Sequence, residues 1–138
     1  MAFISVTRLR GRRFAYLPVF ILFALRSSRQ AKRAAGNLGV GLLREANRTF
    51  WTRTAWRDES SMRAFMLAMP HRRAMEKLAE WCDEAAVVHW TQENTELPEW
   101  REAHRRMVSE GRRSKVKHPS ADHEAYRIAP PKVGIGER

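Results

Sequence analysis

A chain of 138 residues is long enough for one domain with a substantial core but too short for two. A hydrophobic fraction of 43% and five tryptophans exclude a disordered chain. The single cysteine, Cys82, excludes a disulfide framework and favours a reducing, cytoplasmic setting.

The positive charge is concentrated in the first part of the chain. Residues 1–57 contain 12 Lys and Arg but a single acid, Glu45, and so carry the whole net charge of +11. Such a basic region can attract anions. Because 21 of the 26 basic residues are Arg, codon bias accounts for this charge as well as selection for a partner does.

The apolar stretch at residues 14–25 follows four arginines and resembles a secretory signal at first sight. It is too short for a transmembrane helix, and no small-x-small cleavage site follows it. We therefore expect a soluble, cytoplasmic protein with no stable membrane insertion. An alternative is that this apolar helix and its arginines lie on a membrane surface.

The first half of the chain predicts a strand, a helix and a hairpin. Residues 2–9 alternate and are rich in β-branched side chains, which indicates a strand. A helix begins near Pro18, runs to about Ala35 and ends at Gly36.

A hairpin should follow this helix. Residues 37–46 predict a second strand, which Gly39 and Gly41 weaken, and the aromatic and threonine residues at 48–56 predict a third. Residues 45–48 (EANR) form the turn between them.

The second half begins with an interrupted helix. Asp58 is a suitable N-cap, and Pro70 divides the helix that follows. The apolar positions before the break have helical spacing: Met62, Phe65, Met66 and Met69. The pattern resumes after it at Met75, Leu78, Ala79 and Cys82.

A fourth strand and a last helix complete the predicted elements. The strand covers residues 84–92, and the helix begins at Pro98 and ends at Gly111. Its apolar positions are Trp100, Ala103 and Met107. The polar, Pro- and Gly-containing remainder predicts an extended arm that is not part of the core.

The order β-α-β-β-α-β predicts an α+β, ferredoxin-like domain over residues 1–95, with a C-terminal helix and extended arm over 96–138. Both helices of such a domain lie on one face of its sheet. The other face needs a cover, and a second copy of this short chain would supply it. We therefore expect a symmetric homodimer.

The stretch FWTRTAWRDESSMRAFMLAMPHRRAM (residues 50–75) resembles the antibiotic-biosynthesis-monooxygenase-like dimeric α/β barrels, nearest to their spheroidene-monooxygenase-like members. Their pattern is a strand-ending Trp, an acidic-Ser turn, an amphipathic helix and a His near the helix break. The resemblance covers roughly residues 1–95. It implies a cavity between sheet and helices, oxygenation of a hydrophobic substrate, and haem as a possible cofactor.

Residue by residue, Trp56 matches the strand-end Trp, and His71 matches the post-helix His of haem-degrading members. The strand-1 Asn of those members has no counterpart, and Ser5 or Thr7 stands in its place. The resemblance thus gives His71 a place as catalytic residue and haem ligand.

Strand alternation assigns one polar set to the face of the cavity. Its members are Ser5, Thr7, Thr52, Thr54, Trp56, His89 and Thr91. Gly39 and Gly41 are expected to leave space there, whereas Arg53 points to the other face without an evident partner. We predict catalytic roles for His71, Trp56 and Thr54, and ligand binding by Ser5, Thr7, Thr52, His89 and Thr91.

Each of these roles has a structural alternative. The dipole of a helix restarted at Pro70 would keep His71 neutral, as a base or metal ligand requires, but a first-turn His can equally be exposed. His89 can be a buried residue bonded to a backbone carbonyl or a Thr. Trp56 can simply pack the end of the sheet.

The sequence predicts no metal site, because one Cys and two widely spaced tail histidines do not match zinc-ligand spacing. We expect a small monooxygenase-like enzyme that binds a hydrophobic ligand in a cavity of each protomer. An alternative is a non-catalytic ligand-binding or stress-response module on the same fold. Nucleic-acid binding through the basic half is more remote, because the aromatic residues occupy core positions.

Overall fold

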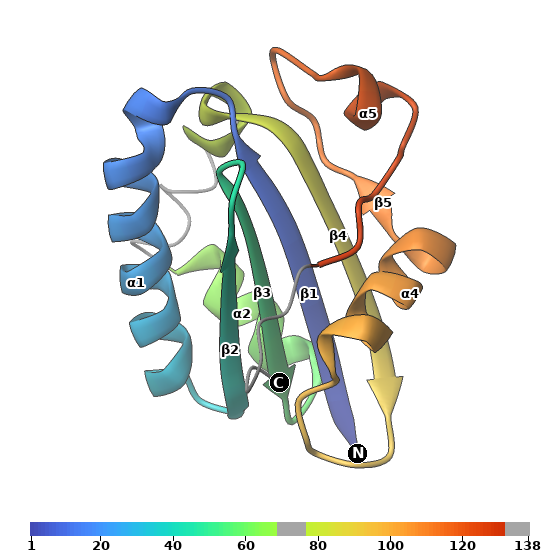
Figure 1. Cartoon of the computed structure of the whole chain (residues 1–138). Helices are drawn as coiled ribbons and strands as arrows, with labels where there is room; N and C mark the ends of the chain where they lie inside the picture. The colour runs from blue at the N-terminus through green and yellow to red at the C-terminus, as the bar shows by residue number, and fades with distance from the viewer. Residues whose placement is uncertain (69–76, 132–138) are drawn as a thin grey trace.

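The computed structural model describes residues 1–68 and 77–131, which form an antiparallel sheet with helices on both faces (Figure 1). The strands are β1 (Ala2–Gly11), β2 (Asn37–Glu45), β3 (Thr49–Trp56), β4 (Cys82–Gln92) and β5 (Arg112–Arg113). Their order in the sheet is β2-β3-β1-β4-β5. The first four strands have the predicted ferredoxin-like arrangement, which is confirmed, and β5 is an addition at the edge beside β4.

The helices divide between the two faces of the sheet. They are α1 (Leu17–Arg33), which follows a short 3-10 turn, α2 (Glu59–Leu67), α4 (Trp100–Glu110) and α5 (Ala121–Glu124). Residues 77–81, just before β4, are also helical. Figure 1 shows α1 and α2 on one side of the sheet and α4 on the other. The face under α1 and α2 is called the cavity face below, and the opposite one the α4 face.

Local sequence signals place the ends of these elements. Asn47 and Arg48 have φ angles of 66° and 60° at the β2–β3 turn, as the primed turns of tight hairpins require. Gly36 has a φ of 84° after α1, a conformation that favours glycine. The Asp58 side chain accepts a 2.8 Å hydrogen bond from the Ser61 N–H and so caps α2.

The α4 face carries a continuous apolar core. Three α4 residues, Trp100, Ala103 and Met107, are buried against the sheet. Their sheet partners include Ile4, Val6, Trp51, Ala55, Val88 and Trp90. The expectation that this face is uncovered is therefore wrong, because the chain's own helix covers it. The homodimer stays a prediction.

Arg53 and the two glycines of β2 belong to this same face. The Arg53 guanidinium stacks over the Trp100 ring, 4.3 Å from its centroid, and donates a hydrogen bond to the Pro98 carbonyl. A Cβ on Gly41 would lie 2.6 Å from Arg53 Nε, and one on Gly39 would lie 3.3 Å from Leu97 Cγ. These glycines make room for Arg53 and Leu97, so the prediction that they leave space in the cavity is wrong.

The C-terminal segment, residues 112–131, is not the extended arm that its composition predicts. Its β5 pairs with β4, His123 is buried, and Tyr126 and Ile128 pack against the core of the α4 face. The pairing at the edge of β4 provides backbone partners that the local sequence does not signal. The segment is thus held against the sheet and the core of the α4 face, although most of its residues are exposed.

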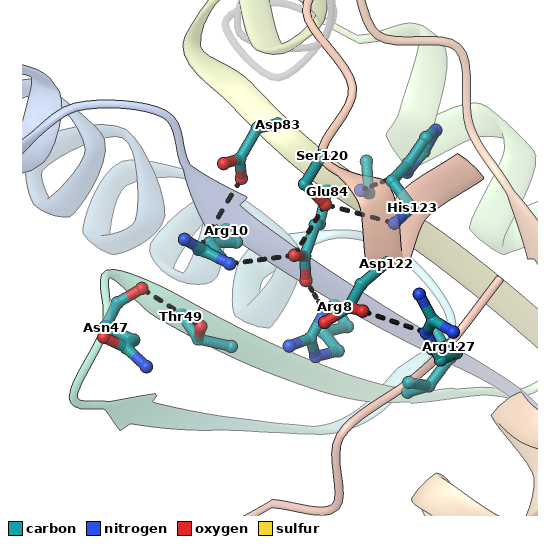
Figure 2. A network of polar contacts seen from close by, with 12 residues as sticks. Arg8, Arg10, Asn47, Thr49, Asp83, Glu84, Ser120, Asp122, His123 and Arg127 are labelled. Carbon is teal, nitrogen blue, oxygen red and sulfur yellow. Dashed lines mark hydrogen bonds and ion pairs between the residues drawn. The ribbon is translucent and has the colours of Figure 1, made fainter. Parts of the chain in front are cut away.

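A buried ion-pair network ties this segment to the sheet (Figure 2). Glu84 accepts hydrogen bonds from Arg8 at 2.7 Å, Arg10 at 2.9 Å and the Ser120 hydroxyl at 2.8 Å. Burial opposes ionisation of Glu84, but the hydrogen bonds from Arg8 and Ser120 and the nearby guanidinium charges hold its pKa below the ordinary value. A carboxylate with three donors offsets the desolvation cost of the buried pair.

The network also changes how the basic first half is interpreted. Arg8, Arg10 and Arg12 are paired with acids from the second half, namely Glu84, Asp83 and Glu80. Part of the N-terminal charge therefore has an internal structural role rather than a partner. Along the ranges 1–68 and 77–131, no helix combines the length and hydropathy needed to cross a bilayer.

Candidate functional site

A cavity of about 400 Å³ lies between the cavity face and the helices above it. Its floor is formed by β1, β2, β3 and β4, its roof by α1 and α2, and one side by residues 78–81. Residues 112–116 of the C-terminal segment close a further side. This volume falls in the range of small-molecule binding sites.

A row of polar side chains crosses the floor. Ser5 on β1 pairs in register with Thr54 on β3 and with His89 on β4. Residues opposite each other in antiparallel strands project to the same face, so all three line the cavity. Thr7 pairs with Thr52 in the row beside it. The sheet register thus brings together Ser5, Thr7, Thr52, Thr54 and His89.

His89 is the most reactive group of this row. Its Nε2 is buried and has no hydrogen-bond partner within the described part of the chain, and its ring lies 5.4 Å from the Phe3 ring, centroid to centroid. Burial lowers the pKa of His89, and the charge of Arg112 lowers it further. The imidazole is therefore neutral near pH 7. The structural alternative, a ring nitrogen satisfied by a carbonyl or Thr, is not what the structure shows for Nε2.

Thr54 and Trp56 form a supporting pair. The Trp56 indole N–H donates to Thr54 Oγ1 at 2.9 Å, and that hydroxyl donates to the Ser5 carbonyl at 3.3 Å. Trp56 is fully buried, stacks on Phe65 at 5.2 Å and does not line the cavity. Its contacts are those of a residue that holds Thr54 and the β1–β3 pairing in place.

The roof is mainly apolar. Phe20 and Phe23 of α1 and Phe65 and Met66 of α2 line it, and Ser27 of α1 adds a hydroxyl. The apolar first half of α1 thus supplies the wall that a hydrophobic ligand would contact. Helical spacing by itself cannot distinguish a packed interface from the wall of a cavity.

One predicted site residue lies outside the cavity, and another is not among the residues that the structure describes. Thr91 is exposed, pairs with Phe3 and is not among the lining residues. His71 and Pro70, on which the predicted catalytic and haem-binding roles depend, lie outside the described residues.

One side of the cavity carries basic residues that the sequence did not predict to be there. Arg112 and Lys115 both line it, from a stretch (GRRSKVKH) that composition marks as a polar arm. A two-residue strand gives no periodic signal, so only the pairing of β5 with β4 could place them.

The donor chemistry of the site is that of an imidazole, several hydroxyls and cations. In the stretches 1–68 and 77–131, no group of three or more His, Cys, Asp or Glu side chains is arranged to hold a metal ion. Cys82 is fully buried, and burial raises its pKa to about 12, so its thiol is not a nucleophile near neutral pH. Proton transfer at His89 is therefore the chemistry that these side chains support best.

No protein-family model matches the chain, and a search of curated proteins finds no match. Solved structures do match. A Nitrosomonas europaea protein described as an antibiotic biosynthesis monooxygenase is 15% identical with a TM-score of 0.60, over 66% of this chain and 89% of its own. Rv0793 from Mycobacterium tuberculosis is 9% identical with a TM-score of 0.61, over 68% and 97%.

A third solved structure is SnoaB, a cofactor-independent oxygenase from Streptomyces nogalater. It is 20% identical with a TM-score of 0.55, over 71% of this chain and 98% of its own. The three neighbours match nearly all of their own length, and roughly a third of this chain has no counterpart in them. The nearer resemblance to spheroidene-monooxygenase-like proteins stays a prediction. The chain therefore shares the ferredoxin-like fold of these three proteins, which is the fold that the resemblance implied.

Proposed function

We propose that this protein is a small oxygenase that acts on a hydrophobic, deprotonatable substrate held in the cavity. The observation that carries the proposal is the neutral imidazole of His89, with its unpaired buried nitrogen, in the wall of an apolar cavity of about 400 Å³. The fold shared with a cofactor-independent oxygenase supports this reaction class, although fold alone does not establish a function.

The chemistry needs a substrate with an acidic CH₂ that is conjugated to a carbonyl group, either directly or through an aromatic ring. A ring nitrogen of His89 accepts that proton, and the hydroxyls of Ser5 and Thr7 lie on the same floor to hydrogen-bond the enolate oxygen. The carbanion forms a C–O bond with O₂, and the peroxide oxygen takes the proton back from His89. Loss of water from the resulting hydroperoxide gives a second carbonyl. The sum is CH₂ + O₂ → C=O + H₂O.

A haem-dependent version of the function is a separate proposal. His71, the predicted ligand, lies outside the described residues, and His89 is the imidazole that the described lining offers. Arg112 and Lys115 are suited in charge to carboxylate groups such as the haem propionates. A saturable Soret shift on titration with haemin that is lost in His71→Ala or His89→Ala would identify the ligand, and no shift would leave haem without support.

The test of the oxygenase proposal uses dithranol, an anthrone whose acidic CH₂ is flanked by two aromatic rings. We expect the protein to accelerate O₂ uptake with one O₂ consumed per quinone formed. His89→Gln should lower kcat by roughly 10²- to 10⁴-fold, the usual contribution of a general base. Thr91→Val, an exposed change on the same strand, is the control and should leave kcat unchanged.

The two function hypotheses give different outcomes in this assay. Saturable binding of dithranol without any acceleration over buffer would support the non-catalytic ligand-binding module instead. Equal turnover by His89→Gln and the unsubstituted protein would remove His89 as the base.

A further inference from the structure

Arg112 brings a positive charge to the cavity from the C-terminal segment. Its register partner on β4 is Val87, a lining residue two positions before His89. Partners in an antiparallel pair project to the same face, so the Arg112 side chain lies on the cavity face. Its neighbour Arg113 pairs with Ala86 and donates to the carbonyls of His123 and Glu124.

The charged residues of the lining are all basic. The described residues that line the cavity include Arg112, Arg113 and Lys115 but no Asp or Glu. Arg113 is engaged with backbone carbonyls, whereas Arg112 and Lys115 have no ion pair with any residue that the structure describes. A pair of cations beside an apolar cavity, without an internal counter-ion, attracts an anionic ligand.

The electrostatic surroundings of His89 lead to the same conclusion. Among the residues that the structure describes, Arg112, Glu59 and Arg63 act on its charge. Glu59 and Arg63 form an ion pair with each other at 2.6 Å, so their fields largely cancel. Arg112 is exposed to solvent where it lines the cavity, and no acidic residue that the structure describes pairs with it. A bound anion would neutralise Arg112 and make the imidazole a stronger base.

We propose that the ligand of this cavity is an amphipathic anion, with its carboxylate, sulfonate or phenolate group bound by Arg112 and its apolar body between the sheet and α1. This inference uses the cavity of the proposed function and names its substrate class, but it does not depend on the oxygenation chemistry. Arginine suits the role because its guanidinium makes paired, charge-assisted hydrogen bonds to such anions.

Two fluorescent probes with one aromatic skeleton test the charge requirement. 8-Anilinonaphthalene-1-sulfonate carries a sulfonate, and N-phenyl-1-naphthylamine lacks it. We expect one sulfonate probe to bind per chain, more tightly than the neutral probe, with an affinity that falls as salt rises. Arg112→Gln should weaken sulfonate binding about tenfold and change the affinity for the neutral probe by less than about twofold.

Two controls locate the probe. Arg105→Gln removes an exposed α4 cation that is paired with Glu102, and it should leave both affinities unchanged. Val87→Trp should fill the cavity and abolish binding of both probes, and Ala24→Trp on α1 serves the same purpose if the first variant does not fold. If the sulfonate probe still binds to a folded variant whose cavity is filled by Trp, the proposal is overturned, because the probe must then bind outside the cavity.

The remaining outcomes are also decisive. If Arg112→Gln lowers the affinity for both probes equally, or leaves the affinity for the sulfonate probe unchanged, Arg112 does not bind the anionic group of the ligand. A failed dithranol assay with intact charge-selective binding would contradict the oxygenase proposal alone. Charge-independent binding with intact turnover would contradict this inference alone.

Discussion

Ser5 and His89 lie directly opposite each other on β1 and β4, and both side chains line the floor of the cavity. Thr54 lies opposite Ser5 on its other side, so three neighbouring strands each contribute one polar residue. Strand pairing fixes these positions through backbone hydrogen bonds rather than through contacts between the side chains. The polar row is consequently preorganised before any ligand enters.

Ser5→Ala should weaken ligand binding without unfolding the protein. The half-buried Ser5 lies directly opposite His89 on the floor, and a lost hydrogen bond costs about 1 kcal/mol, or roughly fivefold in Kd. Fluorescence titration with either naphthalene probe measures the change. Thr91→Val removes an exposed hydroxyl from the same sheet and should have no effect, so an equal loss in both variants would contradict the placement of the site.

Stability should fall as pH drops through the histidine range. Burial and neighbouring arginines lower the folded-state pKa values of His89 and His123 below the unfolded value of about 6.5. Between these values the unfolded chain binds more protons, so the free energy of unfolding decreases with decreasing pH. The Ala85 N–H donates to His123 Nδ1 at 3.3 Å, and protonation of that nitrogen would remove the acceptor.

Urea unfolding at several pH values between 5 and 8 measures this dependence. His123→Asn should reduce the slope of unfolding free energy against pH, whatever its effect on stability at pH 8. His118→Asn is a matched control, because His118 is exposed and is not buried against the sheet. A slope unchanged by His123→Asn would exclude its titration as a cause.

Glu84→Ala should destabilise the protein strongly. It leaves the guanidinium of Arg8, which is 6% exposed, buried without its carboxylate, and such a loss costs about 3–5 kcal/mol. Glu102→Ala, which breaks an exposed pair with Arg105 on α4, is the control and should cost about 1 kcal/mol or less. Chemical denaturation compares the two.

The same substitution tests whether the C-terminal segment is held by the network. Glu84 accepts from Ser120, so Glu84→Ala should also increase proteolytic cleavage after Gly111. Equal stability of the Glu84 and Glu102 variants would show that the buried network does not contribute more than a surface pair.

Gly41→Ala should disrupt the α4 face. The added Cβ would lie 2.6 Å from Arg53 Nε, and Arg53 cannot move away without leaving the Trp100 ring and the Pro98 carbonyl. We expect a loss of about 1–3 kcal/mol, as for overpacked cores. Gly11→Ala is the control, because its Cβ would meet no atom closer than 3.6 Å. Similar melting temperatures for the two variants would contradict this account.

The sequence by itself determined the order and approximate ends of the main elements. Alternation in β1 and β3, the Asp58 cap and the positive-φ turn at residues 47–48 all act over a few residues, so local patterns predict them. The same alternation assigned Ser5, Thr54 and His89 to one face, since a strand's side chains project with a fixed period of two.

Only the tertiary structure decided what lies against each face. That α4 covers the sheet, that Gly41 accommodates Arg53, and that Arg112 reaches the cavity all depend on pairings between residues far apart in the chain. The C-terminal segment has little periodicity of its own, and its place is set by the edge of β4 and by Glu84. Local propensity carries no information about such contacts, because their free energy arises only when distant side chains exclude water together.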